Sequence, residues 1–153
     1  MKYFVDSEYD WDAEAGALVP ISVGIVGDDG REFYGVNRLS VWPDWSPFVW
    51  HNVIPVLGHA GVGCDLLHVN QKALGTAVRA FIGGDVPEFW GDCSAFDYVV
   101  LSMLMGGFED WPTGWPMHVN DCHQAVIVVG ESEVPHHALA DARAVRDACK
   151  GLP

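Results

Sequence analysis

Basic residues are scarce in this chain of 153 residues. Eight Lys and Arg stand against 21 Asp and Glu, so the formal net charge at pH 7 is −13. Binding along a nucleic-acid backbone and binding to an anionic membrane both usually need a basic surface, and this charge disfavours both. A clustered set of the acidic side chains would instead suit divalent cations.

Long apolar runs and targeting segments are also missing. The longest apolar stretches, such as residues 99–105, are far shorter than the roughly 18 apolar residues of a membrane-spanning helix, so no membrane span is expected. The N-terminus lacks the charged region and long apolar segment of a signal peptide, which favours a cytoplasmic protein. With no internal repeat or low-complexity linker, and half of the residues hydrophobic, we expect one domain over residues 1–153.

Cysteine pairs with zinc-site spacing are absent too. The four cysteines are far apart in the sequence and include no Cys-x-x-Cys pair. In a cytoplasmic protein this pattern favours reduced, buried thiols. The four residues are Cys64, Cys93, Cys122 and Cys149.

The spacing of apolar residues predicts an α/β domain. Strand-like runs at 3–6, 18–26 and 31–36, with a turn at 28–30, predict an antiparallel three-stranded meander. Helical spacing at 70–82 and 94–105 predicts two helices, with Asn70 and Ser94 as their N-caps. The remaining predicted elements are helices at 47–57 and 135–150 and strands at 87–91 and 123–129. This order predicts a mixed sheet of about five strands with flanking helices.

Four acidic residues and one histidine occupy special places among these elements. Asp6 and Glu8 are two residues apart at the end of the first strand, so both side chains point to the same side of it. Asp97 lies in the first turn of a helix that follows a buried strand. Asp141 lies near the start of the last helix, five residues after His136. Strand ends and helix N-termini are where functional groups gather in open α/β sheets.

Four carboxylates brought together would repel one another and stay ionised only with cations among them. Hard divalent cations such as Mg²⁺ or Mn²⁺ match such oxygen ligands. Two of these ions, about 3.5–4 Å apart, form the clamp for in-line phosphodiester displacement. A nearby histidine can take the proton of the attacking water, because its pKa lies close to working pH.

Three segments resemble the motifs of the DEDDh 3′→5′ exonucleases, in the ribonuclease T-like superfamily. They are YFVDSE at 3–8, SAFDYVVL at 94–101 and HHALADA at 136–142. They match an Asp-x-Glu, a Phe-Asp at a helix start and a His-x₄-Asp, in the same order. Residues 18–36 and 49–57 further resemble the mycobacterial ribonuclease AS group and related phage proteins. That resemblance implies a ribonuclease H-like fold and a homodimeric, metal-dependent 3′→5′ exoribonuclease, which releases nucleoside 5′-monophosphates from single-stranded RNA and prefers adenylate tracts.

The resemblance also implies a role for each motif residue. Two ions, Mg²⁺ or Mn²⁺, would be bound, with Asp6 bridging both. Glu8 and Asp141 would hold the first ion, and Asp97 would reach the second through water. His136 would be the general base.

Three neighbouring residues qualify this assignment. His137 is the competing candidate for the base, but the x₄ spacing selects His136. Cys93 stands where many DEDDh enzymes have Asn; the ribonuclease AS group also lacks that Asn, so the departure indicates this branch. Tyr9, directly after the Asp-x-Glu, either contacts the terminal nucleotide or packs in the core.

Other residues keep both a structural and a functional interpretation. Exposed aromatic residues in Pro-rich loops either stack on bases or cover an interface or sheet edge; these are Trp42, Trp45, Trp111 and Trp115. Trp90 is expected in the core, and His51 and His123 in the core or an interface. Arg143 and Arg146 lie on a solvated helix face or contact phosphate.

Three rival functions remain open at the level of sequence. The motifs bind metals and phosphate but do not read the 2′-hydroxyl, so an exodeoxyribonuclease acting on DNA is one. A non-catalytic protein that binds nucleic acid or a partner on the same fold is the second. A hydrolase of short oligonucleotides, which differs only in the length of its substrate, is the third. The acidity of the chain is compatible with an enzyme that binds only the last few nucleotides of a nucleic-acid strand, through metal ions and stacking on bases.

Overall fold

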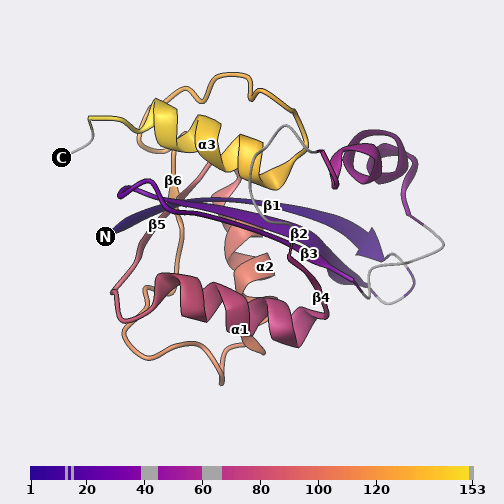
Figure 1. The fold of residues 1–153 in the computed structure, drawn as a ribbon, viewed down its shortest axis with the longest axis horizontal. Coiled ribbons are helices and arrows are strands. Elements are labelled where there is room, and N and C mark those ends of the chain that lie inside the picture. Colours follow the sequence, from indigo (N-terminus) through magenta and orange to yellow (C-terminus); the bar gives the residue numbers. More distant parts are fainter. Residues whose placement is uncertain (13, 15, 39–44, 60–66, 152–153) are drawn as a thin grey trace.

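Six strands form one mixed sheet in a computed structural model, which describes residues 1–12, 14, 16–38, 45–59 and 67–151. The strand order across the sheet is β4-β3-β2-β1-β5-β6 (Figure 1). The strands are β1 (Lys2–Asp12), β2 (Ala17–Gly27), β3 (Glu32–Asn37), β4 (Leu67–Val69), β5 (Glu88–Gly91) and β6 (Asn120–Asp121). The predicted α/β class is confirmed, and the architecture is consistent with a ribonuclease H-like exonuclease. The sheet has six strands rather than about five, because two short strands, β4 and β6, were not predicted and the strand predicted at 123–129 does not form.

The predicted meander is present, with longer strands. β1 pairs antiparallel with β2, and β2 with β3. β5 then joins the other edge of β1 in parallel. The register of β1 against β2 shifts between Glu8 and Tyr9, so a bulge marks the point where the predicted Asp-x-Glu motif ends.

Helices cover both faces of this sheet (Figure 1). α1 (Gln71–Ile82) and α2 (Ser94–Met105) lie on one face, and α3 (Ala138–Ala148) lies on the other. Alternate residues of β1 serve the two cores: Tyr3 and Val5 pack with α1 and α2, whereas Phe4 packs with α3. Burying each such side chain stabilises the fold by roughly 1.5–3 kcal/mol. Because the alternation continues along the strand, Asp6 and Glu8 face α3.

The helix starts agree only partly with prediction. Asn70 caps α1 as predicted, since its side chain accepts a hydrogen bond from the Ala73 N–H at 3.0 Å. Ser94 was wrongly predicted as the cap of α2: Cys93 is the N-cap, and the Ser94 hydroxyl donates instead to Asp121 at 2.8 Å. The last helix begins later than predicted because His136 has φ 64°, a left-handed conformation that no helix accommodates.

The predicted strand at 123–129 is wrong. β6 ends at Asp121, whose side chain accepts the Gln124 N–H at 2.9 Å and starts a turn. Ile127 and Val129 then pack against the core cluster of α3 instead of extending the sheet. The apolar run is therefore satisfied by packing on a helix rather than by strand pairing.

The predicted helix at 47–57 is present as two short helical segments. They are η1 (Val49–Val53) and η2 (Ile54–Val56). Val49 and Val53 pack against Ile21 of β2, which attaches the segment to the sheet. Among the described residues, no helix is long and apolar enough to cross a bilayer.

Candidate active site

Three carboxylates converge where β1 meets the start of α3. Asp6 and Glu8 come from β1, and Asp141 comes from the first turn of α3. One oxygen of each lies within 4.8 Å of the others, so a single cation could contact all three. Asp141 lies 133 positions after Glu8 and 135 after Asp6 in the sequence, and the packing of α3 on β1 brings the three together in one oxygen-rich cluster.

Asp97 lies behind this cluster, on the α2 side of the sheet. Its side chain is only 2% exposed. Ser7, which points to the opposite face from Asp6 and Glu8, donates its hydroxyl to Asp97 Oδ1 at 2.7 Å. The other oxygen, Oδ2, is buried and has no hydrogen-bond partner. A Cβ on Gly91 would lie 2.6 Å from that oxygen, so the absence of a side chain at Gly91 makes the space that Oδ2 occupies.

The pKa values of all four carboxyl groups are raised. Burial is the main cause for Asp6, whose pKa lies well above its usual value, and the charges of Asp97, Glu8 and Asp141 add to it. Burial and the neighbouring charges raise the pKa of Glu8 to about 7. Burial raises the pKa of Asp97 to about 7, against the hydrogen bond from Ser7. The cluster therefore resists full ionisation unless cations neutralise it.

This donor set fits a hard divalent cation. All of its donors are carboxylate oxygens, which are the preferred ligands of Mg²⁺ and Mn²⁺. The unpartnered, buried Oδ2 of Asp97 is a polar atom that costs free energy until something binds it. The fit rests on Asp6, Glu8 and Asp141 as a compact group, with Asp97 beside them.

The two candidate histidines have different surroundings. His136 lines the cavity over the carboxylates, and its ring meets the edge of Phe48 at a centroid distance of 5.0 Å. His137 is 1% exposed and packs against Tyr34 at 4.3 Å, and burial lowers its pKa. Of the two histidines, only His136 lines the same cavity as Asp141. His136 is also the histidine that the His-x₄-Asp spacing selects.

The cavity measures about 790 Å³ and is strongly acidic. Its described lining contains no Lys or Arg. It does contain six acids: Asp6, Glu8, Asp10, Asp92, Glu131 and Asp141. These carboxylates would repel a phosphate that enters the cavity, so a bound cation would be needed to hold the phosphate there.

Aromatic side chains stand at the rim of the same cavity. Tyr9 lines it and stacks on Phe96, with ring centroids 5.0 Å apart. Trp11 and Phe48 line it while 60% and 55% exposed. The Ser46 N–H donates to Asp10 at 2.6 Å, which ties the segment bearing Phe48 to β1. Exposed rings of this kind can stack on bases.

Sequence reasoning missed Trp11, Phe48 and Asp92 as cavity residues. Trp11 lies in the part of β1 beyond the short predicted strand, and Phe48 reaches the cavity only through the docking of residues 46–49 on β1. Asp92 directly follows β5, so a carboxylate after a buried strand was the signal that could have found it.

The other aromatic and histidine candidates lie elsewhere. Trp111 and Trp115 pack against the core on the α1 and α2 side. Their rings meet edge to face, with centroids 5.9 Å apart. Trp90 packs against the α3 core as predicted, and Trp45 is partly buried by η1. Trp42 lies outside the described residues. His51 and His123, expected in the core or in an interface, are both exposed, so the core alternative is wrong and the interface alternative stays a prediction; His123 contacts Asp92 at 3.1 Å.

The remaining candidates are two arginines and the four cysteines. Arg143 pairs with Glu32 at 2.6 Å, and Arg146 with Asp147 at 2.8 Å, so both take the structural interpretation. Cys122 and Cys149 are buried free thiols, as predicted, whereas the expectation of a buried thiol is wrong for Cys93, which is exposed and lines the acidic cavity. Cys64 lies outside the described residues.

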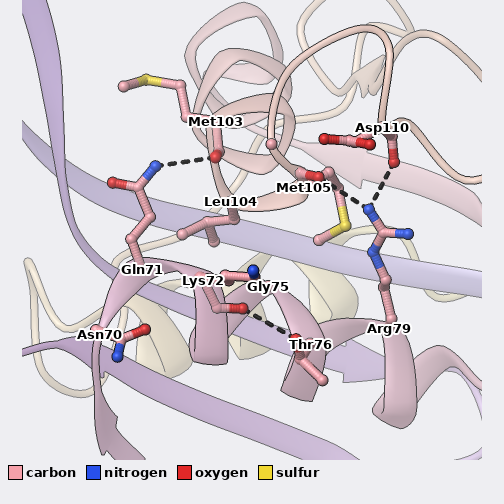
Figure 2. A pocket seen from close by; sticks show the side chains of 11 residues that line it. Asn70, Gln71, Lys72, Gly75, Thr76, Arg79, Met103, Leu104, Met105 and Asp110 are labelled. Carbon is pink, nitrogen blue, oxygen red and sulfur yellow. Dashed lines mark hydrogen bonds between the residues drawn. The ribbon is translucent and has the colours of Figure 1, made fainter.

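A second cavity, of about 760 Å³, lies between α1 and α2 (Figure 2). Its polar side chains are largely engaged with the end of α2. Gln71 donates to the Met103 carbonyl at 2.9 Å, and Arg79 donates to the Met105 carbonyl at 2.8 Å. None of the candidate catalytic residues lines it.

Two curated proteins are similar to this chain along most of its length. Both come from Mycobacterium tuberculosis, strains CDC 1551 and H37Rv, and both are named 3'-5' exoribonucleases. Each is 29% identical over 152 residues, which cover 94% of this chain and 88% of the relative. Comparison of the chain with protein-family models gives no match.

Proposed function

We propose that the chain is a metal-dependent 3′→5′ exoribonuclease of the DEDDh type, which removes nucleoside 5′-monophosphates from the 3′ end of single-stranded RNA. The observation that carries this proposal is the convergence of Asp6, Glu8 and Asp141 in a cavity that His136 also lines. The names of the two similar proteins support the polarity and the RNA substrate.

The carboxylates would hold two ions, Mg²⁺ or Mn²⁺. Asp6 would lie between both, Glu8 and Asp141 would hold the first, and Asp97 would serve the second through water. When bound, the ions would supply charge to hold the scissile phosphate and lower the pKa of the attacking water. Asp97 is the most deeply buried of the four, and its free Oδ2 supports this assignment.

His136 would accept the proton of the attacking water as the general base. Its place on the cavity, in contact with Phe48 and close to Asp141, supports this role. A positioned base of this kind typically contributes about 10²–10⁴-fold to the rate.

The substrate would be held mainly at its last nucleotides. The described cavity lining offers acids and rings rather than basic side chains, so the chain itself contributes stacking by Tyr9, Trp11 and Phe48. Tyr9 is the ring next to the Asp-x-Glu motif and is proposed to contact the terminal nucleotide. Adenylate preference and a homodimeric assembly rest on the resemblance of the sequence motifs.

The test is digestion of 5′-labelled RNA and of DNA with the same sequence, in excess Mg²⁺ or Mn²⁺. Asp6→Asn and Asp141→Asn are expected to reduce hydrolysis to background. Asp147→Asn is the matched control, because Asp147 lies on the same helix but is exposed and paired with Lys150 and Arg146. It should retain wild-type activity.

Each other result has a definite meaning. Wild-type activity of Asp6→Asn in excess metal would overturn the assigned site. Faster degradation of DNA than of RNA would favour the alternative function, an exodeoxyribonuclease with the same active site. RNA binding without any product would leave a non-catalytic binding protein, and a homopolymer series read in the same assay decides the adenylate preference.

A further inference from the structure

Gly24 lies on β2 directly opposite Asp6 of β1. Residues directly opposite in an antiparallel pair point to the same face, so any side chain at position 24 would project beside Asp6 toward α3. Gly24 has no positive φ, and an alanine could adopt its backbone conformation without strain. Whatever requires glycine here is therefore the surrounding space.

That space is filled by the backbone of α3. A Cβ on Gly24 would meet the carbonyl carbon and oxygen of Ala138 and the Cα of Leu139, all closer than the 3.0 Å that real Cβ atoms essentially never cross. A clash with a flexible side chain can be relieved by rotation, but these are main-chain atoms. The helix itself would have to move.

The part of α3 that touches Gly24 is the part that carries the site. Ala138 is the first residue of the helix, Asp141 follows three residues later, and His136 precedes it by two. The carboxylates of β1 and the Asp141 carboxylate thus approach each other across a contact that only glycine permits.

We propose that Gly24 is a positioning residue, whose missing side chain lets α3 settle on β2 and sets the distance of Asp141 from Asp6 and Glu8. This rests on the proposed function for its catalytic consequence, but its effect on metal binding does not need the reaction. Carbon atoms in contact are about 3.5–4.0 Å apart, so a methyl group at position 24 would lift the start of α3 by about 1 Å. Mg²⁺ holds its ligands at about 2.0–2.1 Å with little tolerance, so a shift of this size breaks the site.

The chain offers a matched control on the opposite face of the sheet. A Cβ on Gly75 of α1 would collide with the carbonyl carbon and oxygen of Leu104 on α2 (Figure 2). Gly75→Ala therefore adds the same methyl group against main-chain atoms of a neighbouring element. It does so at the C-terminal end of α2, seven residues after Asp97, and the helix pair carries none of Asp6, Glu8, Asp141 and His136.

The experiment measures Mn²⁺ binding by titration calorimetry without RNA, thermal unfolding without metal, and RNA hydrolysis. Both Gly24→Ala and Gly75→Ala are expected to lower the unfolding temperature. Only Gly24→Ala should weaken Mn²⁺ binding, by tenfold or more, and lower kcat by about 10²-fold, as a misplacement of 1 Å does. If Gly24→Ala does not fold, Ala142→Val, which enlarges a buried residue of α3, tests the same spacing.

Two results would overturn the proposal. One is Mn²⁺ binding by Gly24→Ala, or by Ala142→Val in its place, with wild-type affinity. The other is an equal loss of affinity in Gly75→Ala, since general loosening of the fold would then be the cause. If the wild-type protein binds Mn²⁺ but does not hydrolyse RNA, the proposed function is wrong. The comparison of Mn²⁺ affinities by calorimetry still tests the role of Gly24, because it does not depend on hydrolysis.

Discussion

Ser7 shows how much one residue inside a motif contributes. In the Asp-x-Glu pattern it fills the middle position, which places no demand on residue type. The alternation of β1 turns Asp6 and Glu8 toward α3 and Ser7 toward α2, where its hydroxyl donates to Asp97 at 2.7 Å. The strand therefore arranges carboxylates on both of its faces, and Ser7 is the link to the second.

Replacing Ser7 with Ala should shift the pH dependence of the reaction. The hydrogen bond from Ser7 lowers the pKa of Asp97, so its loss raises that pKa further above about 7. Because the ionised carboxylate is the form that serves the metal site, the acidic limb of the kcat/KM profile should move to higher pH. The stability should also fall by about 1–3 kcal/mol, the cost of an unsatisfied buried acceptor.

Ser94→Ala is the control for this measurement. Ser94 also donates its hydroxyl to a carboxylate, Asp121, at 2.8 Å, but Asp121 does not line the acidic cavity. Its pH profile should coincide with that of the wild type. If both variants shift the profile equally, or if Ser7→Ala does not shift it, the link from Ser7 to Asp97 has no part in the chemistry.

The sequence predicted single residues well where local rules fix their direction. The period of two along a strand is enough to place Asp6 and Glu8 side by side, and the first turn of a helix is enough to place Asp141. Asp92 could have been found from its place directly after β5, a buried strand. Phe48 was missed because its position depends on the docking of residues 46–49 on β1. Such tertiary contacts leave no periodic signal.

At the scale of elements, residues 122–130 explain the largest error in the predicted fold. Their β-branched run has the composition of a strand, but the Asp121 side chain and successive backbone turns bend the chain away after β6. Val126 is forced into φ 60°, which is costly for a β-branched residue, and it is 89% exposed. Composition alone predicted a strand at 123–129, and the polar turn that begins at Asp121 prevents it from forming.

Val126→Asn should therefore stabilise the protein. Asn tolerates the left-handed conformation that costs other residues about 1–2 kcal/mol, and the exposed Val126 loses no packing. The expected gain is about 1 kcal/mol in the free energy of unfolding, measured by urea denaturation. Val128→Asn is the control, since Val128 is 86% exposed without a positive φ and should change little. An equal effect of both substitutions would show that backbone strain at position 126 is not the cause.

At the scale of the whole molecule, a large part of the acidity behind the net charge of −13 gathers in one cavity. Six of the 21 acids line it, and the described lining holds no Lys or Arg. The sequence predicted that some acids would cluster around cations. The motifs do not include three further members of the cavity lining: Asp10 lies later in β1, Asp92 directly follows β5, and Glu131 lies in the segment before α3. The described cavity thus concentrates more negative charge than the motifs alone require.

This concentration should make the metal-free protein less stable as pH rises. Unfolded carboxyl groups titrate near 3.8 for Asp and 4.5 for Glu, whereas Glu8 and Asp97 titrate at about 7 in the folded protein. Between about pH 4 and pH 7 the folded state holds more protons than the unfolded state, so the free energy of unfolding falls with rising pH. For Glu8 the loss is on the order of 3 kcal/mol, at about 1.4 kcal/mol for each unit of pKa. Urea denaturation in a chelator should show this fall, and excess Mg²⁺ should reverse it at pH 8 by about 2.7 kcal/mol when its concentration is a hundred times its Kd.

Asp6→Asn separates this mechanism from a general effect of acidity. The amide removes the most strongly perturbed charge, so the metal-free variant should be more stable than the wild type at pH 8, while Mg²⁺ should no longer add stability. Asp147→Asn removes an exposed, paired charge on α3 and should leave the pH dependence and the response to Mg²⁺ unchanged. If Asp6→Asn were destabilising at pH 8 in a chelator, the cluster would not be the source of the strain. A carboxylate cluster that destabilises the metal-free protein and stabilises the metal-bound protein accounts for both the acidity of the cavity and the expected need for metal.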